Sequence, residues 1–389
     1  MSVMDTATVS IRPASTSCFR VSISSASLRA IVSPSVLALV SAFHCLRSDG
    51  ATLPDGAAGG TGFLNIPVHR SPPPSTRLGS VIMTSMLSDL PPEDAARLMS
   101  LPCTAESIGI DQLEGGITNR NYRLRRSSGD LVVRLSDPGS SDLAIDRENE
   151  YLNTLAAAQA GAGPEVVDYR RGEGILVVRW IEGRTFTTDD VGTPENLPRI
   201  ASACLALHGG PAFASRFDMF DLQARYLTLV RERGYRLPPR YDEFSPVVER
   251  IRLAMRESPE ALVPCNNDLL AANFIDDGAR VWLIDYEYSG SNEASFELGN
   301  IWSESTLSDD LLELLTMSYW GEYSAEKIAR ARLWALMSKY GWTLWASIQQ
   351  AVSPIDFDYW SWGMEKYERA VSEFDSSLLD SWLDEVARP

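Results

Sequence analysis

Residues 264–288 constrain the fold of this chain more than any other stretch. They read PCNNDLLAANFIDDGARVWLIDYEY. Two apolar runs, 273–275 and 281–284, stand on either side of Gly278, a residue type that favours tight turns. The pattern predicts a β-hairpin, and its second strand ends directly at the carboxylate of Asp285.

Three polar residues in this stretch have the chemistry that phosphoryl transfer needs. Mg²⁺ prefers hard oxygen ligands and usually takes only one or two carboxylates, while phosphates and water complete its octahedron. Asn273 and Asp285 can supply those protein ligands, which leaves Asp268 to orient a substrate hydroxyl and accept its proton. The alternative is that an Asp followed five residues later by an Asn marks only a loop and a hairpin. Asp285 and matching elements upstream favour the functional interpretation.

The same residues resemble the choline/ethanolamine kinase branch of the aminoglycoside-phosphotransferase-like family. That family carries HND, an Asn five residues after the Asp, and a strand end similar to IDFEYS; this chain has NND, Asn273 and IDYEYS. One residue departs from the pattern, because Asn266 stands where the family has His. The resemblance implies an α+β, protein-kinase-like two-lobed fold that phosphorylates an alcohol with ATP and Mg²⁺.

The composition excludes several other classes of protein. The formal net charge of −17 argues against nucleic acid as a partner, because phosphates require Lys and Arg. The five Cys show neither a CxxC pair nor a His-flanked metal spacing, so no zinc site or disulfide framework is indicated. No stretch has the apolar length of a membrane span. A reducing, cytoplasmic compartment fits this composition best, and the resemblance implies ATP and a small-molecule substrate as the partners.

The first 85 residues differ in composition from the rest of the chain. They contain six Arg and three Asp but neither Glu nor Lys. An Arg- and Ser-rich, acid-poor start is typical of an organelle transit peptide. The alternative, which we favour, is a disordered extension, or sequence ahead of a start at Met83 or Met86. We expect the folded domain to begin near Pro91.

A glycine-containing turn is expected at residues 114–119. Gly115 and Gly116 offer exposed backbone amides, and Thr118 and Asn119 add side-chain donors, so the turn can fold over phosphates. Most Gly-Gly turns are only turns. Here the segment also resembles the GGxTN segment of the family, which implies a nucleotide-binding turn.

Arg134 is the candidate cation for the nucleotide phosphates. It lies in the alternating run 131–135, where a period of two places it opposite the apolar positions 131, 133 and 135. Kinases use a cation here, and the first Lys of this chain is residue 327, so Arg134 takes the role. The alternative is an Arg that faces solvent.

A Ser-Ser-Asp run at 140–142 predicts the start of a helix that extends to about residue 160. Glu150 on this helix matches the position of the family glutamate that pairs with the strand cation. Glu148 is the alternative partner.

Residues 181–184 leave the predicted sheet as a hinge between two lobes would, although a surface loop is equally compatible. We expect an N-lobe over 91–181, β-rich and nucleotide-binding, and a helical C-lobe over 182–389 that carries the catalytic loop and substrate pocket. Helical spacing occurs in four C-lobe runs, at 197–208, 221–233, 244–256 and 309–319.

Residues 334–367 are unusually aromatic. Aromatic residues at helical spacing are more often core than site. This run, however, resembles the choline-binding stretch of the family, with Trp where Tyr is common at its end. Aromatic faces bind quaternary ammonium groups, because such ions are large and weakly hydrated. The implied substrate-binding residues are Trp342, Trp345, Phe357, Tyr359 and Trp362, with Glu287 and Glu304 at acidic family positions.

The resemblance therefore implies a kinase that phosphorylates the hydroxyl of choline or a close amino-alcohol. Two alternatives stay open. One is an ethanolamine or aminoglycoside-type phosphotransferase. The other is a catalytically weak relative that only binds a nucleotide or an amine, because Asn266 replaces the family His.

Overall fold

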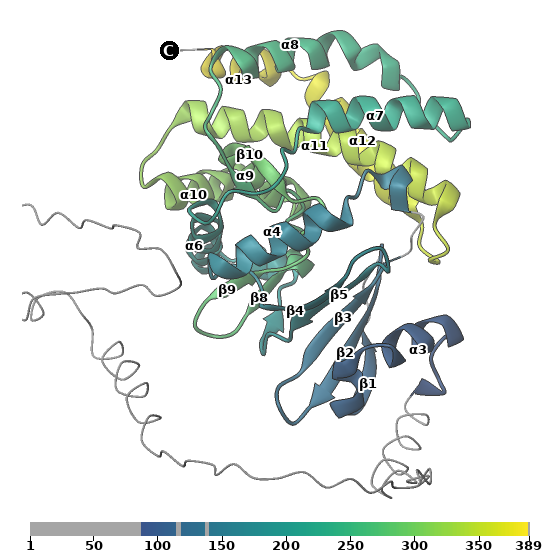
Figure 1. The fold of residues 1–389 in the computed structure, drawn as a ribbon. Helices are drawn as coiled ribbons and strands as arrows, with labels where there is room; N and C mark the ends of the chain where they lie inside the picture. The colour runs from purple at the N-terminus through teal and green to yellow at the C-terminus, as the bar shows by residue number, and fades with distance from the viewer. Residues whose placement is uncertain (1–86, 114–117, 137–139, 388–389) are drawn as a thin grey trace, which may run out of the picture. The chain divides into compact units, whose positions relative to one another are not determined.

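The amino-terminal part of the described chain is a five-stranded antiparallel sheet (Figure 1). The computed structural model describes residues 87–113, 118–136 and 140–387. The strand order is β1-β2-β3-β5-β4. The bounds are β1 Ser107–Leu113, β2 Arg120–Arg126, β3 Leu131–Leu135, β4 Val166–Arg170 and β5 Ile175–Arg179. This sheet confirms the predicted β-rich lobe.

The side chains of strand β3 point to two different faces of the sheet. One face packs in the core, and the other carries Arg134. Leu131, Val133 and Leu135 are buried in a cluster that also contains Leu98 of α3 (Pro92–Met99). Arg134 therefore projects from the opposite face, as the period of two predicts.

Helix α4 (Arg147–Gln159) packs beside β4, and it begins later than the sequence predicts. The predicted start at 140–142 is wrong, because residues 140–143 form the short 3₁₀ helix η2. The side chain of Asp146 caps α4 instead, since it accepts hydrogen bonds from the amides of Glu148 and Asn149.

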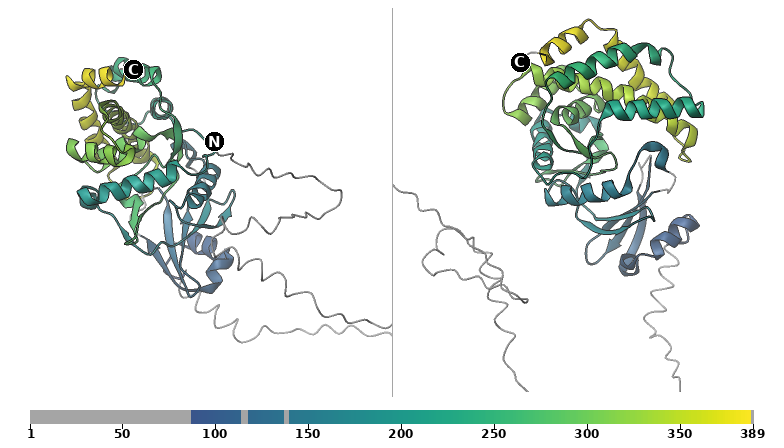
Figure 2. Two further views of the ribbon diagram at one scale, coloured as in Figure 1. Left: turned by 90° about the vertical axis from the view of Figure 1, so that its left-hand side faces the viewer. Right: turned by 45° about the horizontal axis from the view of Figure 1, so that its top comes forward.

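The carboxy-terminal part is mainly helical and is built around α11 (Ala325–Val352). Helices α7, α9, α12 and α13 all pack against α11 (Figures 1 and 2). The other α-helices are α5 Thr188–Val191, α6 Leu197–His208, α7 Met219–Arg233, α8 Ser245–Glu257, α9 Ala294–Glu304, α10 Asp309–Trp320, α12 Tyr359–Phe374 and α13 Leu378–Val386. Further 3₁₀ helices are η1 Pro102–Glu106, η3 Pro194–Asn196, η4 Tyr241–Phe244 and η5 Ala271–Asn273.

These helices confirm the predicted helical lobe, and α6, α7, α8 and α10 coincide with the four predicted runs. Within the part of the chain that the structure describes, none of the helices combines the length and the apolarity that a membrane crossing requires.

The predicted hairpin lies between the sheet and the helices. Strands β8 (Phe274–Asp276) and β9 (Val281–Leu283) pair antiparallel, and Gly278 turns between them with φ of 88°. The short β6 (Arg184–Thr185) joins the outer edge of β8. Just before and after this hairpin, β7 (Leu262–Cys265) pairs with β10 (Gly290–Glu293). The hairpin prediction is therefore confirmed.

A buried ion pair fixes α11 to the end of β10. Arg330 is fully buried, and its Nε and Nη2 atoms lie 2.7 and 2.9 Å from the carboxylate oxygens of Glu293. The indole of Trp334 donates to the same carboxylate at 2.7 Å. The guanidinium also donates to the carbonyl of Met255 at 2.8 Å, which ties α8 to the same point.

We predict that Arg330→Met destabilises the fold by about 3–5 kcal/mol, because it leaves the carboxylate of Glu293 buried without a cation. Arg231→Met is the matched control, since the Arg231–Asp242 pair is more than half exposed, and it should cost at most about 1 kcal/mol. Urea denaturation of both variants measures the difference. Equal, small losses of unfolding free energy would contradict a structural role for the buried pair.

Candidate functional site

Two cavities meet at the predicted phosphoryl-transfer residues. The first, here called the sheet cavity, has a volume of about 340 Å³ and lies against the strands and the hinge. The second, the aromatic cavity, has a volume of about 130 Å³. Asn273 and Asp285 line both. The sheet cavity is lined by, among others, Val132, Arg134, Glu150, Leu176, Trp180 and Ile181. The aromatic cavity is lined by, among others, Asp268, Tyr288, Glu304, Trp342, Trp345 and Trp362.

The loop that carries Asp268 is anchored through its backbone amides. The carboxylate of Glu297 on α9 accepts the amide of Asn266 at 2.9 Å and the amide of Asn267 at 2.8 Å. Asn300, one turn further along α9, accepts the amide of Leu269 at 2.8 Å. The buried helix α9 thus sets the position of the loop on both sides of Asp268.

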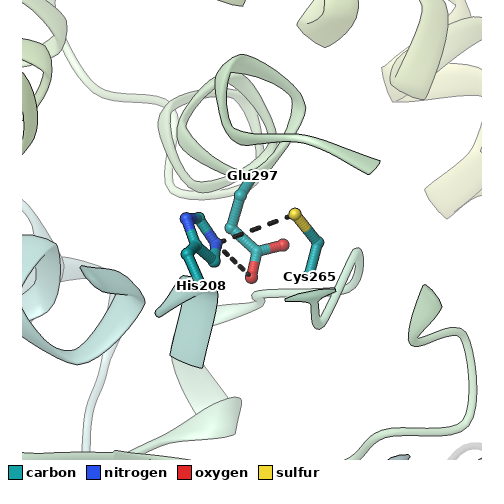
Figure 3. Close-up of side chains that lie close together, drawn as sticks. All are labelled: His208, Cys265 and Glu297. Atoms are coloured by element: carbon teal, nitrogen blue, oxygen red, sulfur yellow. Dashed lines mark hydrogen bonds and ion pairs between the residues drawn. The ribbon is translucent and has the colours of Figure 1, made fainter. Parts of the chain in front are cut away.

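Beneath this loop, His208 and Cys265 lie close to Glu297 (Figure 3). Nε2 of His208 is 3.7 Å from Sγ of Cys265 and 3.7 Å from a carboxylate oxygen of Glu297. Its Nδ1 is 2.7 Å from the hydroxyl of Tyr319.

These ligand-type atoms lie within 4.8 Å of one another, which is close enough for a metal. Burial raises the pKa of the Cys265 thiol well above its usual value. Both oxygens of Glu297 already accept loop amides. The cluster is therefore best described as a hydrogen-bonded support for the loop.

Asn266 connects the loop to the end of strand β9. Its Nδ2 donates to the carbonyls of Ile284 and Asp285 at 3.0 and 2.8 Å, and its Oδ1 accepts the amide of Asp268 at 3.1 Å. The side chain of Asn266 thus sets the separation between Asp268 and Asp285. It supplies both a donor and an acceptor, which a His side chain can also supply.

Asn273 and Asp285 present oxygen atoms suited to Mg²⁺. The amide nitrogen of Asn273 donates to the carbonyl of Asp268 at 2.7 Å, which leaves the oxygen end of the amide for a cation. Asp285 has a left-handed backbone with φ of 63°, an uncommon conformation for a non-glycine residue. An amide oxygen and one carboxylate fit the hard-ligand preference of Mg²⁺, so both predicted metal ligands are chemically suitable.

Arg134 lies between two carboxylates. Its Nη1 donates to Glu150 at 2.6 Å and to Asp285 at 2.8 Å. Burial opposes the charge on Arg134, but the two carboxylates outweigh this effect and raise its pKa. Glu148, the alternative partner, forms its ion pair with Arg171 instead.

A second partly buried arginine, Arg147, was not identified from the sequence. It donates to Glu150 at 2.8 Å, to Glu287 at 3.2 Å and to Asn119 at 3.0 Å. Asn119 in turn donates to Glu287 at 2.8 Å. Burial and the charge of Asp285 raise the pKa of Glu287 to about 7, although Arg147 partly offsets them. The sequence signal that could have identified Arg147 is its spacing from Glu150, since residues three apart on a helix lie side by side.

Burial also raises the pKa of Asp268 well above its usual value. The neighbouring carboxylates Asp285, Glu304 and Glu287 add to this effect, while the ammonium of Lys366 opposes it. A base with a raised pKa accepts a proton more readily, which suits the role predicted for Asp268.

The predicted substrate residues divide into two groups. Trp342, Trp345 and Trp362 line the aromatic cavity with Glu287 and Glu304. Tyr288 also lines it and was not predicted; its hydroxyl accepts a hydrogen bond from the indole of Trp345 at 2.8 Å. The other group comprises Phe357 and Tyr359, which lie behind the lining. The ring of Tyr359 contacts that of Trp345, and Phe357 contacts Tyr359 and is 39% exposed.

The glycine turn is only partly described. Gly115 and Gly116 lie outside the described residues. Thr118 and Asn119 line the aromatic cavity, which places these two predicted nucleotide ligands on the substrate side of the junction.

The fold and the site define a protein-kinase-like phosphotransferase. The structure is similar to a crystal structure of a choline/ethanolamine kinase family protein from Mesorhizobium loti, with a TM-score of 0.68 and 29% sequence identity; the match covers 78% of this chain and 99% of that one. A family model described as choline/ethanolamine kinase matches residues 110–327. The chain therefore belongs to the choline/ethanolamine kinase family.

Two curated relatives extend this result. Protein LicA from Haemophilus influenzae is 27% identical over 247 residues, which cover 61% of this chain and 72% of LicA. Ethanolamine kinase 2 from Mus musculus is 26% identical over 299 residues, which cover 68% of this chain and 76% of the mouse protein. Family membership supports phosphorylation of an amino-alcohol and does not fix which one.

We predict that Asn266→Ala lowers kcat by roughly 10²-fold, since a misplacement of about 1 Å at a reacting group can cost that much. Asn266→His should retain much more activity, because the imidazole can replace part of the hydrogen bonding. Steady-state kinetics with melting curves of both variants measures the effect. A gain of a hundredfold in Asn266→His, about 2.7 kcal/mol of barrier, would instead mean that Asn266 impairs the wild-type enzyme.

Proposed function

We propose that this protein phosphorylates the hydroxyl of choline, or of a close amino-alcohol, with ATP. The observation that supports this most is the junction of the two cavities. Asp268 lies in the aromatic cavity, while Asn273 and Asp285 line both cavities. A phosphoryl donor in one cavity and an alcohol in the other would meet at these three residues.

The sheet cavity suits a nucleotide. Val132, Leu176 and Ile181 offer apolar surface for a base, and Arg134 lies toward the junction, where phosphates would lie. A guanidinium stays charged when buried and matches phosphate oxygens, so it can replace the lysine common in kinases. Asn273 and Asp285 would hold Mg²⁺, which would offset the negative charge of the phosphates.

The aromatic cavity suits a small organic cation. Trp342, Trp345 and Trp362 supply ring faces, and Glu287 and Glu304 supply carboxylate oxygens. Aromatic faces attract a cation through the ring quadrupole, and the attraction grows when water is excluded. Trp342 and Trp345 are each only 4% exposed, so a cation between them would be largely desolvated.

Asp268 would orient the substrate hydroxyl toward the phosphoryl group and accept its proton. Its position is set by Asn266 and by the α9 anchors, so little reorganisation is needed during the reaction.

One observation supports ethanolamine as a second candidate. Among the described residues, Oε1 of Glu304 is buried and has no hydrogen-bond partner. A primary ammonium could donate a hydrogen bond to it, which a trimethylammonium cannot.

The direct test measures ADP release with choline, ethanolamine and an aminoglycoside as acceptors. We expect choline or ethanolamine to be phosphorylated. Asp268→Asn should cut kcat by roughly 10²–10⁴-fold with ATP binding retained, the range for loss of a general base. Asp285→Asn should also weaken the binding of Mg²⁺-ATP, because it removes the negative charge of a metal ligand. A wild-type protein that binds ATP yet phosphorylates no amino-alcohol would contradict the proposal.

The aromatic cavity gives a separate prediction. Removal of a desolvated cation–π contact costs ~2 kcal/mol, on the order of 30-fold in binding. Trp345→Ala should therefore raise KM for choline by about 30-fold and leave KM for ATP unchanged.

Trp334→Ala is the matched control, because Trp334 is equally buried, lies on the same helix and does not line the cavity. Both variants should lose stability, but only Trp345→Ala should lose choline affinity. Equal choline KM values in the two folded variants would show that Trp345 serves only the core.

A further inference from the structure

An internal ammonium group lies beside the aromatic cavity. Lys366, on α12, is 6% exposed and forms an ion pair with Oε2 of Glu304, at the end of α9. Its Nζ also lies over the ring of Trp362, 4.2 Å from the centroid. Glu304 and Trp362 both line the cavity. The lysine therefore makes the two kinds of contact, carboxylate and aromatic face, that a substrate ammonium would make.

This arrangement changes what the cavity offers to a substrate. The side chains of Lys366 and Glu304 are only 8% and 3% exposed, so little solvent screens their attraction. The charge of Glu304 is thus largely neutralised within the protein. One of its oxygens and one face of Trp362 are already occupied, while Trp342, Trp345 and Tyr288 keep ring surface toward the cavity.

We propose that Lys366 is a specificity-determining residue, which favours methylated over primary ammonium groups by neutralising Glu304. The inference rests on the proposed function. A quaternary ammonium needs aromatic faces and cannot donate hydrogen bonds, so it loses little when Glu304 is paired. A primary ammonium keeps a tight hydration shell and needs acceptors to replace it, so it loses more.

The first experiment uses the wild-type enzyme and a methylation series. Ethanolamine, N-methylethanolamine, N,N-dimethylethanolamine and choline carry the same hydroxyl, and each added methyl group replaces one N–H donor. We expect kcat/KM to rise with each methyl group, measured by ADP release. If kcat/KM falls with methylation, the inference is overturned while the kinase function stands. If none of the four alcohols is phosphorylated, the proposed function itself is wrong.

The second experiment removes the charge. Lys366→Met has a side chain of similar length without an ammonium, and it frees the Glu304 carboxylate to accept N–H donors. The ratio of kcat/KM for ethanolamine to that for choline should rise on the order of tenfold, the size of one hydrogen bond to a charged group. Lys366→Arg keeps a cation and should keep the wild-type ratio.

Lys339→Met is the matched control. Lys339 is likewise a buried lysine; it pairs with Glu373, and it does not line the cavity. It should lose stability without a change in the substrate ratio. A folded Lys366→Met enzyme with the wild-type ratio would show that Lys366 only packs the helices. If Lys366→Met does not fold, the methylation series on the wild-type enzyme is the test of the inference, and a kcat/KM that falls with methylation overturns it.

Discussion

The site depends on keeping several carboxylates close together and away from water. Asp268, Asp285 and Glu287 lie around one junction, and burial with mutual repulsion raises the pKa of both Asp268 and Glu287. The fold offsets the repulsion with partly buried arginines, since Arg134 donates to Asp285 and Arg147 donates to Glu287. Carboxylates still outnumber cations there. Under the proposed function, a divalent metal ion and an organic ammonium would neutralise this excess of carboxylates.

The position of these carboxylates is set mainly by hydrogen bonds to backbone groups. Glu297 accepts two loop amides, and Asn266 joins the loop to the carbonyls at the end of β9. Asn267 and Asp285 both have left-handed backbones, with φ of 69° and 63°. Such conformations cost of order 1–3 kcal/mol each and persist only where the surroundings impose them. Asn267 shows how they are imposed, because its buried side chain donates to the carbonyls of Cys265, Tyr288 and Gly290.

Local sequence order predicted the hairpin and the three residues at the junction because Asp268, Asn273 and Asp285 belong to one short stretch whose turn and strands are themselves local. The sheet and four helices followed from periodicity. The start of α4 did not, since residues 140–142 and Asp146 all have capping chemistry and only the packed structure decides between them. The contacts of Arg147 with Glu287 and of Lys366 with Glu304 span 140 and 62 residues. Nothing in the local pattern of either residue indicates its partner, so tertiary structure alone reveals them.

The ion pairs also explain why an arginine rather than a lysine suits position 134. Arg134 bonds to Glu150 and Asp285, and Glu150 in turn accepts from Arg147, which bonds to Glu287. This chain of contacts runs from the sheet cavity to the aromatic cavity, so a change of charge at one end alters the field at the other. Burial lowers the pKa of a lysine and can neutralise it, whereas a guanidinium keeps its charge at any pH that the fold survives. Arg134 therefore stays charged beside Asp285, while Glu287, whose pKa is raised to about 7, lines the aromatic cavity at the other end of this chain of contacts.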